Sequence, residues 1–224
     1  MWSICSPPSE NEAGVSGVLG PLWTRARGLG RYGRNGGVSG LGSIASKAQL
    51  RMSFLRRAVV AVPLVLLLGF GSGSLAPAGE ENAWYRALAK PAATPPSAAF
   101  PIVWTTLYAL MGLALAIVLH ARGARGRGAA VALFAAALAL NLVWSPLFFG
   151  AHEVTAAWML IVAMLLSGIA ATVAFARVRP VAGWLLVPYL VWIAYAGVLN
   201  FRIDQLNPDA EELAPGSRTT QIIG

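Results

Sequence analysis

The chain has 224 residues, of which 57% are hydrophobic and only 12% are charged. Its mean hydropathy of +0.63 excludes an ordinary soluble domain, because a fold of this size cannot bury that much apolar surface. The formal net charge of +8 does not indicate nucleic-acid binding, because the arginines lie mostly in the first 57 residues and in short loops between apolar runs. The single cysteine, Cys5, excludes disulfides within the chain, zinc fingers and iron–sulfur clusters.

Residues 1–51 are rich in glycine, serine and arginine and show no sustained hydrophobic periodicity. Such a composition cannot bury enough apolar surface to offset the entropy of ordering, so we predict a disordered basic extension. Two interpretations stay open: the extension is a functional basic arm, or the natural start is Met52. We favour the second, because the run MSFLRR from Met52 is typical of a membrane-protein N-terminus.

Residues 52–206 contain five apolar runs, each close to or longer than the ~20 residues that a helix needs to cross ~30 Å of hydrocarbon. The short alternating strands of a membrane barrel are absent from the sequence. We therefore predict an all-α integral membrane domain, a five-transmembrane-helix bundle. Arg56 and Arg57 precede the first run and small residues follow it, so a cleaved signal peptide stays an alternative for that run. The five runs are residues 58–75, 101–121, 129–149, 154–176 and 181–201.

The segment that leads into the second run, residues 84–104, is a loop dense in aromatic residues and prolines. Prolines fix the backbone, and Trp and Tyr favour the membrane interface, so this loop is suited to form a shaped lid over an apolar site. A position in the interfacial aromatic belt is the alternative for its first tryptophan. The candidate ligand-binding residues in the loop are Trp84, Pro91, Pro95 and Pro96.

The charged residues between the runs predict the orientation of the chain. Lysines and arginines precede the first run and follow the second and fourth runs, whereas most acidic residues lie in the other loops and in the tail. The positive-inside rule therefore predicts a cytoplasmic N-terminus and an outside C-terminus. The aromatic loop and the polar C-terminal tail, residues 207–224, then share the outer side.

The five runs contain no Asp, Glu, Lys or Arg. Ion-coupled transporters and proton pumps usually keep such a residue as the coupling element, so we do not expect a driven transporter. The two histidines, His120 and His152, fall at helix ends on opposite sides of the membrane, which excludes a bis-histidine haem. The sequence shows no Ser-His-Asp grouping, phosphate-binding loop or metal-binding cluster, so we predict no metal site and no ordinary hydrolytic catalysis.

The five runs contain aromatic and amide side chains. Trp104 and Tyr108 are four residues apart and share one face of the second helix. For the tryptophans the interfacial belt fits the spacing as well as a pocket does, and for the asparagines a hydrogen bond between helices is the favoured alternative. Pro146 and Pro188 free backbone carbonyls and can bend helices around a cavity. The candidate binding residues in the runs are Trp104, Tyr108, Asn141, Trp144, Trp158, Trp192 and Asn200.

Three motifs resemble those of a known family. The run WYxxLxKPxxxPPxxxFPxVWxxLYxxMG spans residues 84–112, ALNLVWSPLFFG spans residues 139–150, and PYLVWIAYAGVLN spans residues 188–200. In this order they resemble the hallmark of the TspO/MBR family, the tryptophan-rich sensory proteins or translocator proteins. The likeness extends over about residues 59–206.

The resemblance implies a bundle of five transmembrane helices, commonly a homodimer, with a ligand pocket under the first loop. Family members bind porphyrins such as protoporphyrin IX, some bind sterols or synthetic drugs, and bacterial members are linked to tetrapyrrole regulation. Some are reported to degrade protoporphyrin in light, and the two tryptophans implicated there match Trp104 and Trp192. By motif position, the resemblance also implies pocket roles for Trp144, Asn200 and Trp158.

The function expected from this resemblance is a membrane sensor or regulator that binds protoporphyrin IX or a related tetrapyrrole as a ligand, without a resident cofactor. One alternative is a light- and oxygen-dependent porphyrin-degrading enzyme that uses Trp104 and Trp192 as catalytic residues. Another is a passive transporter of porphyrins. The composition, heavy in alanine, glycine and arginine, indicates a GC-rich bacterium and therefore its inner membrane.

Two further expectations concern partners. The family's sterol-associated pattern has Tyr where this chain has Phe201, so we do not expect sterol binding. The third run carries small residues that allow close approach of backbones, which suits a homodimer interface, although packing within the monomer explains them equally well. These residues are Ala132, Ala135, Ala136 and Ala139.

Overall fold

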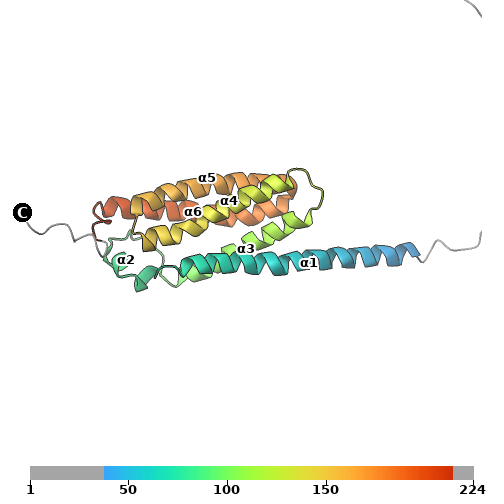
Figure 1. Ribbon diagram of the computed structural model, residues 1–224, viewed down its shortest axis with the longest axis horizontal. Helices are drawn as coiled ribbons and strands as arrows, with labels where there is room; N and C mark the ends of the chain where they lie inside the picture. The colour runs from blue at the N-terminus through green and yellow to red at the C-terminus, as the bar shows by residue number, and fades with distance from the viewer. Residues whose placement is uncertain (1–37, 214–224) are drawn as a thin grey trace, which may run out of the picture. The chain divides into compact units, whose positions relative to one another are not determined.

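The computed structural model describes residues 38–213, which form helices joined by short loops and turns (Figure 1). The chain divides into two units, residues 1–45 and residues 46–224, and the second unit contains every candidate membrane span. The expected all-α fold with five transmembrane helices is confirmed, and the chain is a multi-pass membrane protein. The five spans are Ala48–Gly73, Ala99–His120, Arg127–Gly150, Val154–Val178 and Pro180–Leu206.

Local sequence signals account for several helix ends. Asn82 begins the short helix α2, where its side chain accepts a hydrogen bond from the backbone N–H of Tyr85 at 3.1 Å. Pro180 occupies the first turn of α6, a position at which its missing N–H leaves no hydrogen bond unmade. The elements in chain order are α1 (Val38–Gly73), η1 (Gly79–Glu81), α2 (Ala83–Ala87), α3 (Ala99–His120), α4 (Arg127–Ser145), the π-helix η2 (Pro146–Gly150), α5 (Val154–Val178) and α6 (Pro180–Leu206).

The first helix begins earlier than the sequence led us to expect. α1 starts at Val38, so residues 38–51 are helical, although we predicted no regular structure for residues 1–51. The segment just before Met52 contains Ala, Lys, Gln and Leu, which are good helix formers, and extending an existing helix is far easier than nucleating one. The rest of the predicted extension and residues 214–224 of the predicted tail lie outside the described residues.

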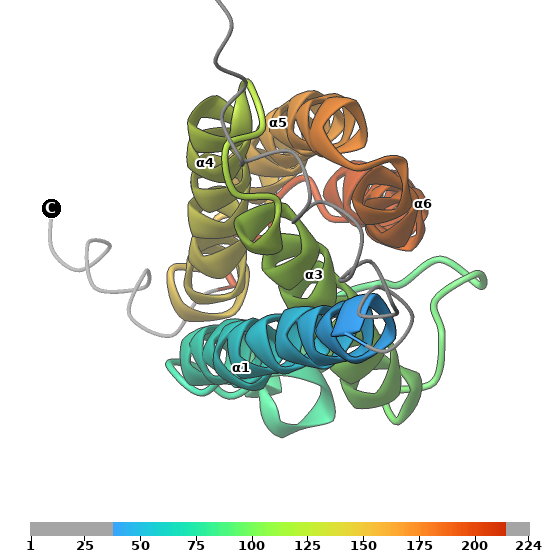
Figure 2. The ribbon, with the colours of Figure 1, turned by 90° about the vertical axis from the view of Figure 1, so that its right-hand side faces the viewer.

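Within residues 46–213 the five long helices pack side by side (Figure 2). α6 packs against both α5 and α3, and α4 packs against α5. α1 completes the bundle between α3 and α4, because Ser72 donates a hydrogen bond to the carbonyl of Leu142 on α4 and Gly112 of α3 lies against the α1 backbone. A Cβ at Gly112 would stand 2.6 Å from the Cα of Val62, so only glycine fits at this crossing.

Many large apolar side chains lie on the surface of the bundle. Leu67 is 71% exposed and Leu166 is 64% exposed, as expected of side chains that face lipid. Between the helices, Phe134 of α4 stacks on Phe175 of α5 with ring centroids 5.2 Å apart, and both side chains are buried. Packing between helices and contact with hydrocarbon together explain the high hydropathy of the sequence.

Candidate functional site

A cavity of about 600 Å³ lies between the helices toward the end of the bundle that carries α2. Its volume falls within the ~300–1,000 Å³ that is typical of small-molecule sites. All five long helices contribute side chains to it, together with η1, η2 and the loop after α2. We call it the aromatic cavity, because its lining includes Phe70, Tyr85, Phe100, Trp104, Tyr108, Trp144, Phe148, Phe149 and Trp192.

Stacking between neighbouring rings fixes how the aromatic side chains stand in the wall. Trp104 stacks on Tyr108 with centroids 5.1 Å apart and planes 28° apart. Trp144 stacks on Phe148 at 5.1 Å and 9°. Both pairs are four residues apart, a spacing that places side chains one above the other on a helix. The stacked pairs give the cavity flat, apolar walls on α3 and on α4 with η2.

The apolar wall also contains polar side chains. The Tyr108 hydroxyl donates a hydrogen bond to Oδ1 of Asn141 at 3.0 Å. In contrast, Nδ2 of Asn141, Nε1 of Trp144 and Oδ1 of Asn200 are buried and have no hydrogen-bond partner among the described residues. Buried polar atoms are normally paired. The residues of the wall therefore hold two unused donors and one unused acceptor.

A change of helix type brings two phenylalanines to this wall. α4 passes into the π-helix η2 at Pro146, which cannot donate a backbone hydrogen bond. Single π-helical turns are rare and occur frequently at functional sites. Phe148 and Phe149 of this turn line the cavity. The sequence predicted a disturbance at Pro146 but not the residues that it would position.

The N-terminal part of the aromatic loop is fixed to the rest of the bundle by two buried side chains. Asn82 donates a hydrogen bond to the carbonyl of Phe149 at 3.0 Å. Nε1 of Trp84 donates to the carbonyl of Ala210 at 2.8 Å. The Trp84 ring also packs edge-on against Phe148, with centroids 5.4 Å apart. Trp84 therefore anchors the loop and does not line the cavity.

The later part of the loop is anchored to α6 and the residue after it. Asn207 accepts a hydrogen bond from the N–H of Ala89 at 2.8 Å and donates one to its carbonyl at 2.9 Å. The Tyr195 hydroxyl donates to the carbonyl of Ala93 at 2.6 Å. These three hydrogen bonds hold the loop against α6, next to Thr94 and Ser97 of the cavity lining.

The mouth of the aromatic cavity is acidic. Glu80 and Glu81 line it, and no Lys, Arg or His stands among its described lining residues. Two cations stand beside these residues: Nη1 of Arg86 donates a hydrogen bond to the carbonyl of Glu80 at 2.9 Å, and Nζ of Lys90 lies 4.6 Å from the ring centroid of Tyr85. Burial raises the pKa of the Tyr85 phenol, and the charge of Glu80 raises it further. The Tyr85 hydroxyl therefore stays neutral at physiological pH.

The two histidines stand apart from the aromatic cavity. His120, at the end of α3, contacts Arg57. His152 packs against Trp84 near the α2 end, with ring centroids 4.6 Å apart. Within residues 38–213, no three His, Cys, Asp or Glu side chains gather where they could hold a metal ion.

The structure brings six of the eleven predicted binding residues together and leaves five outside the lining. The Trp84 side chain packs in a second, smaller hydrophobic cluster. Trp158 packs on Phe201 with ring centroids 5.3 Å apart. The loop reaches the cavity through Thr94 and Ser97, and not through Pro91, Pro95 or Pro96. The six that line the cavity are Trp104, Tyr108, Asn141, Trp144, Trp192 and Asn200.

Several lining residues were missed by the sequence reasoning. Phe148 and Phe149 stand in the second motif and Tyr85 in the first, so the motifs themselves held that signal. Phe70 is the only aromatic residue of the first apolar run, residues 58–75, and its ring meets Tyr108 edge-on at 6.3 Å. Its isolation in an aliphatic run was the available clue.

The fold and the site define a multi-pass membrane protein with an aromatic, ligand-sized cavity inside a five-helix bundle. Residues 60–206 match the TspO/MBR family, and the chain belongs to that family. It is 42% identical over 149 residues to the tryptophan-rich protein TspO of Chlorobaculum tepidum, which covers 66% of this chain and 93% of the relative. It is 40% identical over 155 residues to the translocator protein of Bos taurus, covering 66% and 90%. It is 42% identical over 124 residues to the tryptophan-rich sensory protein of Cereibacter sphaeroides, covering 55% and 77%.

Proposed function

We propose that this protein binds protoporphyrin IX or a related tetrapyrrole in the aromatic cavity and acts as a sensor or regulator of tetrapyrrole levels in a bacterial inner membrane. The observation that carries the proposal is that Trp104, Trp144 and Trp192, from three different helices, line one cavity of about 600 Å³. Indole and phenol faces suit a flat, apolar macrocycle better than a flexible aliphatic ligand. The relative in Cereibacter sphaeroides is named a tryptophan-rich sensory protein, which supports a sensory role.

The wall of the cavity also holds polar groups that a ligand can use. The N–H groups of Trp144 and Asn141 and Oδ1 of Asn200 have no partner among the described residues. The carboxylates of the ligand belong at the mouth, where Lys90 attracts them and Glu80 and Glu81 repel them.

The test is titration of the purified protein with protoporphyrin IX in darkness, followed by quenching of tryptophan fluorescence. We expect saturable binding that weakens about three- to tenfold in Trp144→Phe, which removes the N–H donor and shortens the aromatic face of the wall. Trp184→Phe is the matched control, because Trp184 is 74% exposed and lies outside the lining. Quenching that never saturates, or that Trp184→Phe alters as much as Trp144→Phe does, would contradict the proposal.

A second function, light-dependent porphyrin degradation, is favoured by the position of Trp104 and Trp192 in the same cavity wall. A photoexcited porphyrin beside an indole can take one electron from it, and dioxygen is the co-reactant that oxidises the ring. Illumination of the complex in air should then bleach the porphyrin absorbance, and Trp104→Phe with Trp192→Phe should stop the bleaching. Bleaching in darkness, without oxygen or in the double variant would exclude this enzyme. Stable porphyrin absorbance in the illuminated parent protein would exclude degradation and leave sensing as the supported function.

We propose that the N-terminus lies in the cytoplasm and the C-terminus outside. All acidic side chains among the described residues lie at the end that carries α2, which the positive-inside rule places outside. Protease access in sealed vesicles of known orientation tests this arrangement. The opposite end of the bundle carries Arg51, Arg56, Arg57, Arg122, Arg125, Arg127, Arg177 and Arg179.

We propose that two copies associate through α4. Ala132, Ala135, Ala136 and Ala139 are all exposed in the single chain, so they do not serve packing within the monomer. Small residues on a lipid-facing surface let two helices approach closely. A cysteine placed by Ala136→Cys, in a chain whose Cys5 is replaced by Ser, should form a disulfide-linked dimer on mild oxidation. Absence of the crosslink there, with a crosslink at an exposed position of α5 such as Leu166→Cys, would contradict this interface.

A further inference from the structure

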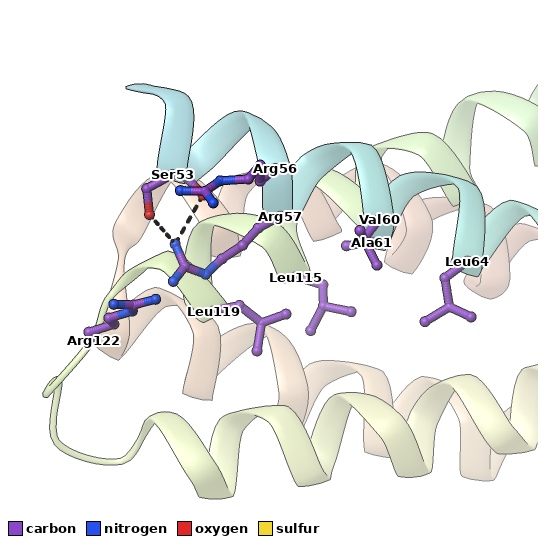
Figure 3. Close-up of a pocket in the computed structure, with 9 residues that line it drawn as sticks. All are labelled: Ser53, Arg56, Arg57, Val60, Ala61, Leu64, Leu115, Leu119 and Arg122. Carbon is purple, nitrogen blue, oxygen red and sulfur yellow. Dashed lines mark hydrogen bonds between the residues drawn. The ribbon is translucent and has the colours of Figure 1, made fainter. Parts of the chain in front are cut away.

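A second cavity, of about 410 Å³, is an open groove between α1 and α3 at the end of the bundle far from α2 (Figure 3). Two arginines of α1, together with Arg122 from the loop after α3, stand at one end of it, and aliphatic side chains continue along it. We call it the arginine groove, defined by Ser53, Arg56, Arg57, Val60, Ala61, Leu64, Leu115, Leu119 and Arg122.

No acidic side chain among the described residues contacts the arginines of the groove. Nη1 of Arg57 donates a hydrogen bond to Ser53 Oγ at 2.8 Å and lies 2.9 Å from Nδ1 of His120. Arg56 and Arg122 are exposed. None of the acidic side chains described in residues 38–213 stands near them, because these lie at the α2 end: Glu80, Glu81, Glu153, Asp204, Asp209, Glu211 and Glu212.

The groove has the polarity of an amphiphile. Figure 3 shows Arg57 and Arg122 together at one end, with Leu119, Leu115 and Leu64 following along the groove. Arg57 and Leu64 are about 10 Å apart along α1 at 1.5 Å per residue. The charged end is at the end of the spans, and the apolar part runs toward their middle, where Leu64 is 49% exposed.

We propose that the arginine groove binds an anionic phospholipid from the surrounding leaflet. The phosphate meets the guanidinium groups of Arg56, Arg57 and Arg122, whose planar N–H donors suit phosphate oxygens. One acyl chain lies over Leu115 and Leu64. The orientation proposed above places this groove in the cytoplasmic leaflet, where anionic lipids give the membrane surface its negative potential. The site is separate from the aromatic cavity and does not depend on porphyrin binding.

The test measures lipids retained by the full-length protein in detergent, by native mass spectrometry. The probes are phosphatidylglycerol and phosphatidylcholine with identical acyl chains. We expect preferential retention of phosphatidylglycerol, with affinity reduced about fivefold for each of Arg122→Gln and Arg56→Gln. Arg125→Gln is the matched control, since it removes the same charge from the same loop outside the groove. Equal retention of both lipids, or equal loss in Arg125→Gln, would overturn the proposal.

A free anion is distinguished from a lipid by two further arms. Inorganic phosphate, added in excess, should displace phosphatidylglycerol poorly, because it cannot use the apolar part of the groove. Leu115→Ser with Leu64→Ser should reduce lipid retention severalfold while leaving any phosphate binding unchanged. Efficient displacement by phosphate, or full lipid retention in the leucine variant, would show an anion site and not a lipid site. Dark protoporphyrin titration of each variant verifies that it has folded.

Discussion

The aromatic cavity and the arginine groove lie toward opposite ends of one bundle and share helices α1 and α3, yet their walls have little in common. The cavity is lined by stacked rings, with two carboxylates at its mouth and no cation among its described lining residues. The groove carries three guanidinium groups above an aliphatic floor and has no acidic residue in its lining. The first arrangement suits the flat ligand proposed for it, whereas the second suits an amphiphile with an anionic head at the membrane boundary.

The element that both sites require is the crossing of α1 and α3. Phe70 and Trp104 reach the aromatic cavity from these two helices, and Arg57 and Leu119 reach the arginine groove from the same two. Gly112, where the backbones touch, lies between the two sites along α3. Breaking the crossing should therefore damage both sites, and changes within one site should leave the other intact.

The largest effect is expected from Gly112→Leu. Its side chain would overlap the α1 backbone at Val62 and Ala61, which cannot move aside as a flexible side chain could. We expect a loss of about 1–3 kcal/mol or more in stability, together with weaker binding at both sites. Thermal unfolding in detergent measures the first effect. The control is Gly128→Leu, where a Cβ meets nothing within 4 Å, and equal melting temperatures for the two variants would refute the shared crossing.

The next largest effect distinguishes the role of the loop from that of the cavity wall. Asn207→Leu removes two hydrogen bonds to Ala89 and should accelerate porphyrin dissociation about tenfold without changing lipid retention at the groove. Stopped-flow fluorescence after mixing with apoprotein acceptor measures the dissociation rate. Gln205→Leu is the control, because Gln205 bonds only to exposed Arg202. An unchanged rate in Asn207→Leu would show that this anchor does not control the lid.

A smaller effect tests the acidic mouth. Replacing Glu80 and Glu81 by Gln removes repulsion and should tighten binding of dicarboxylate protoporphyrin IX about two- to fivefold at low salt. The gain should vanish for the dimethyl ester and shrink at high salt, because screening shortens the range of exposed charges. Glu153→Gln, at the same end but outside the lining, should change neither affinity. A gain that persists with the ester would point to a packing effect instead.

The smallest effect is a pH dependence at Tyr85. Its pKa in the folded protein is raised above the ordinary value of 10.0, so the unfolded chain loses this proton first as pH rises. The contribution of Tyr85 to stability is therefore fully present below pH 10 and falls above it. Melting temperatures between about pH 8 and pH 11 should decline less steeply in Tyr85→Phe than in the parent protein. Parallel curves would show that the phenol is not perturbed.

The spans were predictable from the sequence because lipid demands long runs without charge. The third helix of the structure, α3, covers Ala99–His120 where residues 101–121 were expected, and α5 begins at the expected Val154. Helical spacing predicts which side chains share a face, as it did for Trp104 and Tyr108. It does not predict which neighbour that face meets, and Trp158 accordingly lies against Phe201 and outside the cavity.

The arginine groove was not predictable for a related reason. In the sequence, Arg57 and Arg122 indicate only the orientation of the chain, because each lies near a different helix end. They come together because α1 crosses α3 closely at Gly112, and the sequence alone does not reveal that crossing. Similarly, Pro146 predicted a local disturbance, but the direction of Phe148 depends on the π-helical turn that follows.

The hydrogen bonds that anchor the loop to α6 affect the residence time of a bound molecule as well as its affinity. The helix α6 carries Trp192 and Asn200 of the cavity lining, and it also carries Tyr195 and is capped by Asn207, which bind the loop. One helix therefore holds both the lining and the loop. Exit past the loop requires the three hydrogen bonds to Ala89 and Ala93 to open first. At about 0.5–1.5 kcal/mol each, these bonds lengthen the stay of a bound molecule by roughly ten- to a thousandfold. In the proposed sensory role, such a site would average the ligand concentration over that interval and would not follow each brief fluctuation.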